Sequence, residues 1–255
     1  MIAPADRDTA AAGERAELLT TARATWLLCG CRRGSRMVVL AISGPSGTGK
    51  STIASILHCC LATEGMTVAM IGQDAYFIGP KPQSYWTQAP KESPDTVEMP
   101  ALRTAVRAAS EDAATDVVLV EGFLLLQDAP IMSCVDAVLF LTSDPTTCLA
   151  RRLARSVRTP HESEGLRVYY KKHVWPGYLK HTQPAIAALR EAVAAGVPGK
   201  PRLCEIDGTQ SLEAVTAAAL AALPGLLGEV QMPPRLALRA TPHRTRRWIR
   251  MSQGT

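Results

Sequence analysis

Residues 44–51 read GPSGTGKS, and this stretch decides the fold. It fits the pattern G-x-x-x-x-G-K-[ST] at every fixed position. The glycines let the backbone curl until successive N–H groups point at an anion, and the start of a helix adds partial positive charge. The stretch therefore predicts a loop that binds the phosphates of a nucleoside triphosphate. The residues expected to bind the nucleotide are Gly44, Ser46, Gly47, Thr48, Gly49, Lys50, Ser51 and Thr52.

Two residues of this loop carry further chemistry. Lys50 is placed to reach the β- and γ-phosphates, and the Ser51 hydroxyl to ligate Mg²⁺. A second anchor for Mg²⁺ is expected at Glu121, because that carboxylate ends the apolar run 117–120. The N-K-x-D motif of GTPases does not occur. The chain thus combines a phosphate loop with a metal-side carboxylate, Glu121.

Strand and helix patterns alternate on both sides of the loop. Continuous apolar runs predict buried strands, and an alternation of strands with helices predicts a parallel sheet covered on both faces. The fold class is therefore α/β, a three-layer sandwich of the P-loop NTPase type with a five-stranded parallel sheet and an Arg-rich lid. Strands are expected at 37–42, 67–71, 116–120, 137–141 and 202–206, and helices at about 50–63, 95–109, 145–154 and 211–223.

Composition places the chain among soluble globular proteins, with 47% hydrophobic and 20% charged residues. No apolar run approaches the roughly 20 residues that span a bilayer, and acidic residues near the start argue against a secretory signal. Seven cysteines, an odd number, favour reduced thiols. We therefore expect a cytoplasmic protein with no membrane partner.

Two further stretches look functional. In residues 73–77, QDAYF, a buried strand ends in polar residues, and Asp74 either caps a turn or takes a proton. The polar segment 155–170 follows an expected helix, where kinases of this fold carry a mobile lid. Guanidinium groups there would neutralise charge on a transferring phosphate. The candidate arginines are Arg151, Arg152, Arg155 and Arg158.

Together with the phosphate loop, several segments resemble nicotinamide riboside kinases, within the uridine-kinase-like group of P-loop kinases. The resemblance covers residues 37–223, and its most discriminating segment is HVWPGYLK at 173–180. The other matching segments are ISGPSGTGKST at 42–52, QDAYF at 73–77, PDTVEMPAL at 94–102, VLVEGFLLL at 118–126, FLTSDPTTCLARR at 140–152 and EIDGT at 205–209.

The resemblance implies transfer of the γ-phosphoryl group of ATP to the 5′-hydroxyl of nicotinamide riboside, a step of NAD biosynthesis. It also implies roles: Asp74 as catalytic base, Asp95 on the ribose hydroxyls, Phe77 stacked on the base, Lys50, Arg152 and Arg155 on the phosphates, Ser51 and Glu121 on the metal, and Asp207 and Thr209 beside the adenine. One departure concerns the base, because Val157 stands where a lid aromatic is expected.

The sequence divides the chain into three predicted regions. Residues 1–36 read as an extension with one helix, 37–223 as the P-loop kinase domain with its lid at about 155–170, and 224–255 as a basic, disordered tail. Alternatives stay open: a uridine, cytidine or other nucleoside kinase, or a nucleotide-binding protein with weak or no kinase activity. The core is expected to bind no nucleic acid. The oligomeric state, a role for the tail in binding, and the choice between ATP and GTP are open.

Overall fold

Five parallel strands form the centre of the fold and lie in the order β2-β3-β1-β4-β5. The computed structural model describes residues 37–79, 85–86 and 91–228. The central strands β1, β3 and β4 are apolar and almost wholly buried, as a covered parallel sheet requires. The α/β class and the five predicted strands are confirmed. Their bounds are β1 (Val38–Ser43), β2 (Val68–Gly72), β3 (Val117–Glu121), β4 (Ala137–Thr142) and β5 (Arg202–Asp207).

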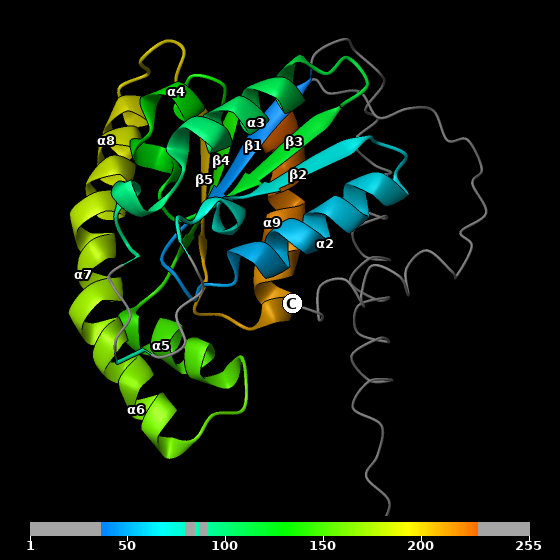
Figure 1. Ribbon diagram of the computed structural model, residues 1–255. Coiled ribbons are helices and arrows are strands. Elements are labelled where there is room, and N and C mark those ends of the chain that lie inside the picture. The colour runs from blue at the N-terminus through cyan, green and yellow to red at the C-terminus, as the bar shows by residue number, and fades with distance from the viewer. Residues whose placement is uncertain (1–36, 80–84, 87–90, 229–255) are drawn as a thin grey trace, which may run out of the picture.

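Helices cover both faces of this sheet (Figure 1). Local signals fix where several of them begin: Asp144 Oδ1 accepts hydrogen bonds from the amides of Thr146 and Thr147 at 2.8 and 2.9 Å, at the start of α5. The helices are α2 (Lys50–Thr63), α3 (Met99–Glu111), α4 (Ala129–Met132), α5 (Pro145–Ala154), α6 (Pro160–Tyr169), α7 (Trp175–Gly177), α8 (Gln183–Ala194) and α9 (Leu212–Leu227).

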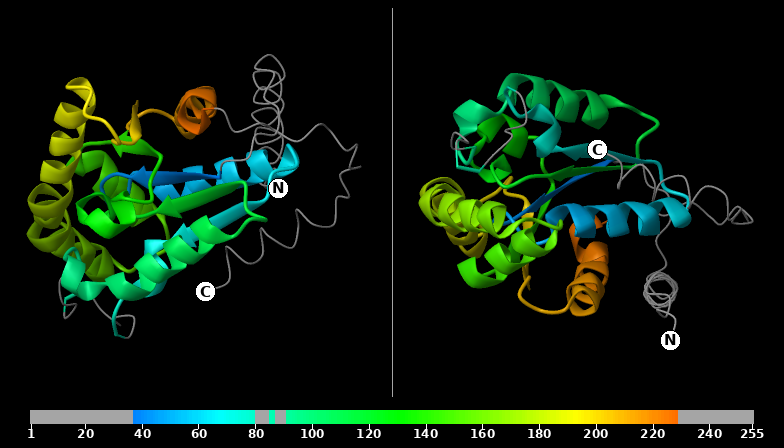
Figure 2. Two further views of the ribbon diagram at one scale, coloured as in Figure 1. Left: turned by 90° about the horizontal axis from the view of Figure 1, so that it is seen from above. Right: turned by 60° about the horizontal axis from the view of Figure 1, so that its bottom comes forward.

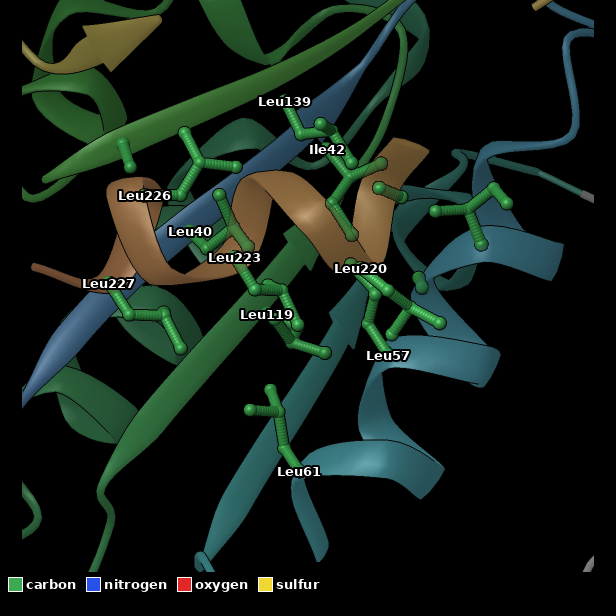
Figure 3. Close-up of a cluster of buried hydrophobic side chains, with 14 of the residues drawn as sticks. Leu40, Ile42, Leu57, Leu61, Leu119, Leu139, Leu220, Leu223, Leu226 and Leu227 are labelled. Carbon is green, nitrogen blue, oxygen red and sulfur yellow. The ribbon is translucent and has the colours of Figure 1, made fainter. Parts of the chain in front are cut away.

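Two apolar cores hold the layers together. Helices α2 and α9 cover one face of the sheet and α3 lies over the other, as the right-hand view of Figure 2 shows. In Figure 3 the leucines of α2 and α9 point toward those of the strands. A fully buried leucine stabilises a fold by about 1.5–3 kcal/mol. The labelled members of this core are Leu40, Ile42, Leu57, Leu61, Leu119, Leu139, Leu220, Leu223, Leu226 and Leu227.

Strand register brings the functional segments to one edge of the sheet. Glu121, the last residue of β3, lies opposite Ile42 of β1 and Gly72 of β2. The phosphate loop follows β1 and Asp74 follows β2. Because the strands are parallel, these segments all emerge at the carboxyl edge of the sheet.

A long helical segment, residues 160–194, runs from the carboxyl edge along the side of the sheet (Figure 1) and is called the rod below. It runs without interruption from α6 through α7 to α8, with π-helical turns at Tyr170–Val174 and Tyr178–Thr182 (Figure 1). Pro176 and Pro184 stand in the first turns of α7 and α8. Each proline removes one backbone donor, and the wider turns let the rod continue past that loss.

The lid contains a helix that its polar sequence did not predict. Residues 160–169, more than half of the expected mobile flap, form α6. A capping box starts this helix: Thr159 Oγ1 accepts from the Glu162 amide at 3.2 Å, and Glu162 Oε2 accepts from the Thr159 amide at 2.8 Å. Leu166 and Tyr169 of α6 are buried. Arg155 and Arg158 lie in the short segment between α5 and this helix.

Two helix boundaries differ from the sequence prediction. Helix α3 starts at Met99 rather than at residue 95, because Val97 pairs with Phe77 in an isolated bridge. Helix α9 ends at Leu227, so residues 224–227 belong to the fold and not to the tail. Proline inside a helix costs about 3 kcal/mol. Burial of Leu226 and Leu227, at about 1.5–3 kcal/mol each, offsets the cost of Pro224.

Two predictions fall on other parts of the chain. The N-terminal helix and extension at 1–36 lie outside the described residues, and so does the basic tail from residue 229 onward. The searched part, residues 37–79, 85–86 and 91–228, contains no helix that is long and apolar enough to cross a membrane.

Candidate active site

The phosphate loop closes tightly over the end of β1. Gly44 has φ 145°, and a Cβ there would clash with the carbonyl oxygen of Leu141 on β4, so only glycine fits. The Pro45 carbonyl accepts a hydrogen bond from Thr48 Oγ1 at 3.0 Å and one from Lys50 Nζ at 2.9 Å. Gly49 then caps α2 in the left-handed region, with φ 98°. This loop has the curled backbone that the sequence predicts.

Lys50, Ser51 and Glu121 meet at the start of α2. Ser51 Oγ donates to Glu121 Oε1 at 3.0 Å, and both Lys50 and Glu121 are buried. Burial lowers the pKa of Lys50, while the carboxylates of Glu121 and Asp74 oppose that shift. Burial likewise raises the pKa of Glu121, and the Lys50 ammonium opposes it. Lys50 and Glu121 are thus held in a buried site, where the charge of a bound ligand would interact strongly with theirs.

Asp74 is exposed at the same edge, one residue after a buried glutamine. Gln73 Oε1 accepts from the Leu124 amide at 2.9 Å, which ties the end of β2 to the segment after β3. The Asp74 carboxylate also lies close enough to Lys50 and Glu121 to shift their pKa values upward. The structure therefore brings Asp74 together with the phosphate loop, with its side chain exposed.

Phe77 and Asp95 are brought together by pairing of their segments. The Ile78 amide donates to the Thr96 carbonyl at 2.9 Å, and the Glu98 amide donates to the Tyr76 carbonyl at 2.7 Å. Asp95 is exposed and accepts from Ser93 Oγ at 3.3 Å. Asp74, Phe77 and Asp95 thus share one side of the site.

Phe123, which the sequence reading did not single out, links the two sides. Its ring lies 5.9 Å from Lys50 Nζ and 6.2 Å from the Phe77 ring. Thr182 Oγ1 on the long rod donates to the Phe123 carbonyl at 2.5 Å and fixes the backbone there. Its only sequence signal is its place two residues after Glu121.

The four candidate arginines divide into two pairs. Arg151 donates to the backbone carbonyls of Thr48 at 3.2 Å and Gln210 at 2.9 Å, and also to that of Gly208. Arg158 donates to the backbone carbonyls of Arg152, Leu153 and Ser156. The sequence assigned both to phosphate neutralisation, but their donors hold the backbone instead.

The other two arginines face the phosphate loop. Arg152 donates to Ser46 Oγ within the loop. Arg155 is exposed, and its charge reaches Lys50 strongly enough to contribute to the lowering of that pKa. Arg152 and Arg155 are therefore the two guanidinium groups positioned for a phosphate.

Asp207 and Thr209 lie apart from this group, on the turn after β5. Asp207 Oδ1 accepts from the Thr209 amide at 2.9 Å and from its hydroxyl at 2.6 Å, and Oδ2 accepts from Gln210 at 2.8 Å. These bonds lower the pKa of Asp207 to about 2. Arg151 links the turn to the phosphate loop, so this turn borders the loop through its backbone. Val157 is fully exposed, and Thr52 is exposed on α2.

Glu92 is a buried acid that the sequence analysis missed. Burial raises its pKa to about 7, while the nearby charges of Arg152 and Lys50 oppose the shift. It packs against Gly177 in the HVWPGYLK segment, where a Cβ would clash with the Glu92 side chain and lie 3.0 Å from its carbonyl oxygen. That glycine explains how residues 91–93 approach the rod so closely.

Glu92→Gln is expected to change how stability depends on pH. The folded protein holds a proton on Glu92 up to about pH 7, whereas the unfolded chain loses it near pH 4.5. Glu92 therefore contributes to the free energy of unfolding at low pH, and this contribution is lost as pH rises toward 7. The glutamine does not titrate, so the free energy of unfolding of the variant relative to the unaltered protein should rise by about 2.5 kcal/mol between pH 5 and pH 8. Urea denaturation at both pH values measures it.

Glu98→Gln serves as the matched control, because Glu98 is an exposed acid six residues further on. Its free energy of unfolding should differ from that of the unaltered protein by a similar amount at both pH values. If the difference in free energy of unfolding between Glu92→Gln and the unaltered protein is the same at both pH values, Glu92 does not carry a raised pKa in the folded protein.

The site fits a magnesium nucleotide. In the searched residues, no cluster of three or more His, Cys, Asp and Glu side chains could hold a metal ion by itself. Mg²⁺ usually takes one or two protein ligands and completes its shell with phosphate oxygens and water. The adjacent oxygens of Ser51 and Glu121 match this pattern.

Comparisons with known proteins agree with this geometry. The AAA domain family matches residues 40–168, which include the phosphate loop, Asp74 and Glu121. A uridine kinase of Mannheimia succiniciproducens is 26% identical over 181 residues, covering 59% of this chain and 82% of that protein. A uridine kinase of Shewanella sp. strain W3-18-1 is 28% identical over 178 residues, covering 58% and 82%.

Among solved structures, one from Silicibacter sp. TM1040 overlaps 67% of this chain and 94% of that one, with 17% identity and a TM-score of 0.47. Because this overlap is too weak to assign a fold, the fold assignment depends on the sheet order and the phosphate loop of this chain.

Proposed function

Because this chain belongs to the AAA domain family, we propose that it is a kinase that transfers the γ-phosphoryl group of ATP to the 5′-hydroxyl of a ribonucleoside. The observation that carries this proposal is the convergence of Lys50, Asp74 and the Ser51–Glu121 pair at one edge of the sheet. Similarity to proteins named uridine kinase supports the nucleoside as acceptor.

The donor side is built from the phosphate loop and the lid. Backbone amides of residues 44–51 and the Lys50 ammonium would bind the phosphates of ATP, with Arg152 and Arg155 on the side of the lid. Ser51 and Glu121 would hold Mg²⁺, which supplies charge neutralisation between phosphate oxygens when it is bound. Lys50 is buried, so its charge acts on the phosphates with little screening by water.

The acceptor side is built from Asp74, Asp95 and Phe77. Asp74 would accept a hydrogen bond from the 5′-hydroxyl and orient its oxygen toward the γ-phosphorus. Phosphoryl transfer depends mostly on such positioning and on electrostatics, because the proton leaves the hydroxyl late. Asp95 would hold the ribose hydroxyls, and the Phe77 ring would contact the base.

Two acceptors are supported by different observations. The HVWPGYLK segment and the other matching motifs favour nicotinamide riboside, which would make the reaction a step of NAD biosynthesis. The names of the relatives favour uridine or cytidine. Val157 is exposed and provides no aromatic surface for the second face of a base, so stacking would rest on Phe77.

A turnover assay tests the proposal. The full-length protein is incubated with ATP, Mg²⁺ and, separately, uridine, cytidine and nicotinamide riboside, and ADP release is measured. We expect ADP formation that depends on the nucleoside and is absent with 5′-deoxyuridine, which lacks the acceptor oxygen. ADP release at the same rate with and without nucleoside would contradict a nucleoside kinase.

A further inference from the structure

Lys91 covers the aromatic surface expected to meet the base. Its Nζ lies 5.2 Å from the centre of the Phe77 ring, close enough for a cation–π contact. Phe123 lies on the same ring at 6.2 Å, tilted by 32°. The contact surface at Phe77 is therefore aromatic and carries one positive charge over the ring.

The backbone of Lys91 is fixed on both sides. Its amide donates to the Tyr169 hydroxyl on α6 at 3.1 Å, and its carbonyl accepts from Thr96 Oγ1 at 3.0 Å. The next residue, Glu92, is buried against Gly177 of the rod. These contacts fix the backbone from which the flexible lysine stem extends to the Phe77 ring.

A row of groups runs from the phosphate loop to Lys91. Lys50 Nζ lies 5.9 Å from the Phe123 ring, that ring lies 6.2 Å from Phe77, and Phe77 lies 5.2 Å from Lys91 Nζ. Asp74 marks the position of the reacting hydroxyl and lies three residues before Phe77. A nucleoside with its 5′-oxygen at Asp74 and its base at Phe77 therefore has its base beside the Lys91 ammonium.

We propose that Lys91 is a specificity residue that selects bases without net positive charge and disfavours bases with a net positive charge. The inference rests on the proposed nucleoside kinase function. Nicotinamide joined to ribose through its ring nitrogen is a cation, so the Lys91 ammonium repels it. Uracil and cytosine are neutral and present carbonyl oxygens, which the three donors of an ammonium group can reach.

The neighbouring carboxylates leave this charge in place. Glu92 is turned into the buried contact with the rod, and none of the salt bridges of the described residues involves Lys91. A like charge at the binding surface is an effective way to reject one ligand while leaving another unaffected. The discrimination is therefore expected to weaken as salt is added.

A pair of nearly isosteric substrates gives the sharpest test. Nicotinic acid riboside has the same ring as nicotinamide riboside but carries a carboxylate in place of the amide. We would measure kcat/KM for both, and for uridine, in the unaltered full-length protein and in Lys91→Met and Lys91→Glu. Each selectivity is a ratio measured on one preparation, so a partly unfolded variant does not change it.

The unaltered protein is expected to prefer uridine and nicotinic acid riboside over nicotinamide riboside. Lys91→Met should raise the relative kcat/KM for nicotinamide riboside on the order of 10-fold, and Lys91→Glu should raise it further. Lys200→Met is the matched control, because Lys200 is exposed near the amino end of β5, at the opposite edge of the sheet. It should leave every ratio unchanged.

The two claims fail in different ways. If the ratios are the same in Lys91→Met, Lys91→Glu and the unaltered protein, or if the unaltered protein prefers nicotinamide riboside, the role of Lys91 is wrong while the kinase function stands. If no nucleoside is phosphorylated by any of these proteins, the proposed kinase function itself is wrong.

Discussion

Asp74→Asn is expected to lower kcat by about 10²–10⁴-fold, the range for loss of a positioned general base. Asparagine keeps the size of the side chain but removes the negative charge that would orient the 5′-hydroxyl. ATP affinity should change little, because the phosphate loop and Arg152 do not depend on Asp74 for a hydrogen bond. Steady-state kinetics with uridine and ATP, together with ATP titration, separate the two effects.

Asp95→Asn is the matched control for this experiment, because Asp95 is the second exposed carboxylate of the acceptor side. Loss of a ribose contact should raise KM for the nucleoside more than it lowers kcat. If Asp74→Asn turns over at the rate of the unaltered protein, Asp74 does not orient the reacting hydroxyl and only shapes the turn after β2.

Lys50→Met is expected to lower kcat by about 10²–10³-fold, the typical effect of removing one preorganised donor to developing negative charge. The methionine fills a similar volume but brings no charge to the phosphates. Loss of the lysine also removes the ammonium group that opposes the raised pKa of Glu121. The Glu121 carboxyl should therefore protonate more readily. The activity of the variant should therefore recover partly at higher pH, where Glu121 ionises.

Thermal melting of Lys50→Met shows whether the variant is folded, and Lys200→Met controls for loss of one lysine from the chain. A folded Lys50→Met that keeps more than a tenth of the original kcat would contradict the role of Lys50 at the phosphates.

The strands and the phosphate loop could be predicted because their signals are local. Buried parallel strands appear as apolar runs such as 38–42, and the loop pattern fixes its own backbone shape. The helix at 145–154 was also predicted with its observed bounds, since Asp144 and Pro145 mark its start.

The missed features depend on contacts between distant segments. Glu92 and Lys91 matter because residues 91–96 pack on a rod some 80 residues later in the chain, at Tyr169 and Gly177. No pattern within the proline-rich stretch predicts that approach. For the same reason the residue pattern alone did not separate Arg151 from Arg152, which only the resemblance singled out: both lie on α5, and the fold shows that Arg151 binds backbone carbonyls.

The HVWPGYLK segment gains a physical explanation from these contacts. The Trp175 and Tyr178 rings lie 4.9 Å apart and stabilise the π-helical part of the rod. Gly177 lets the segment carrying Lys91 and Glu92 pack against that rod. The segment therefore acts as the support on which one wall of the acceptor side rests.

The most direct test follows all phosphorus species in one reaction by ³¹P NMR. The full-length protein is given ATP, Mg²⁺ and uridine, and then nicotinic acid riboside in place of uridine. We predict that one nucleoside 5′-monophosphate appears for each ADP, without inorganic phosphate. With Asp74→Asn, neither the monophosphate nor ADP should appear on the same time scale. ADP accompanied by inorganic phosphate, with no nucleoside monophosphate, would show that the protein hydrolyses ATP and is not a nucleoside kinase.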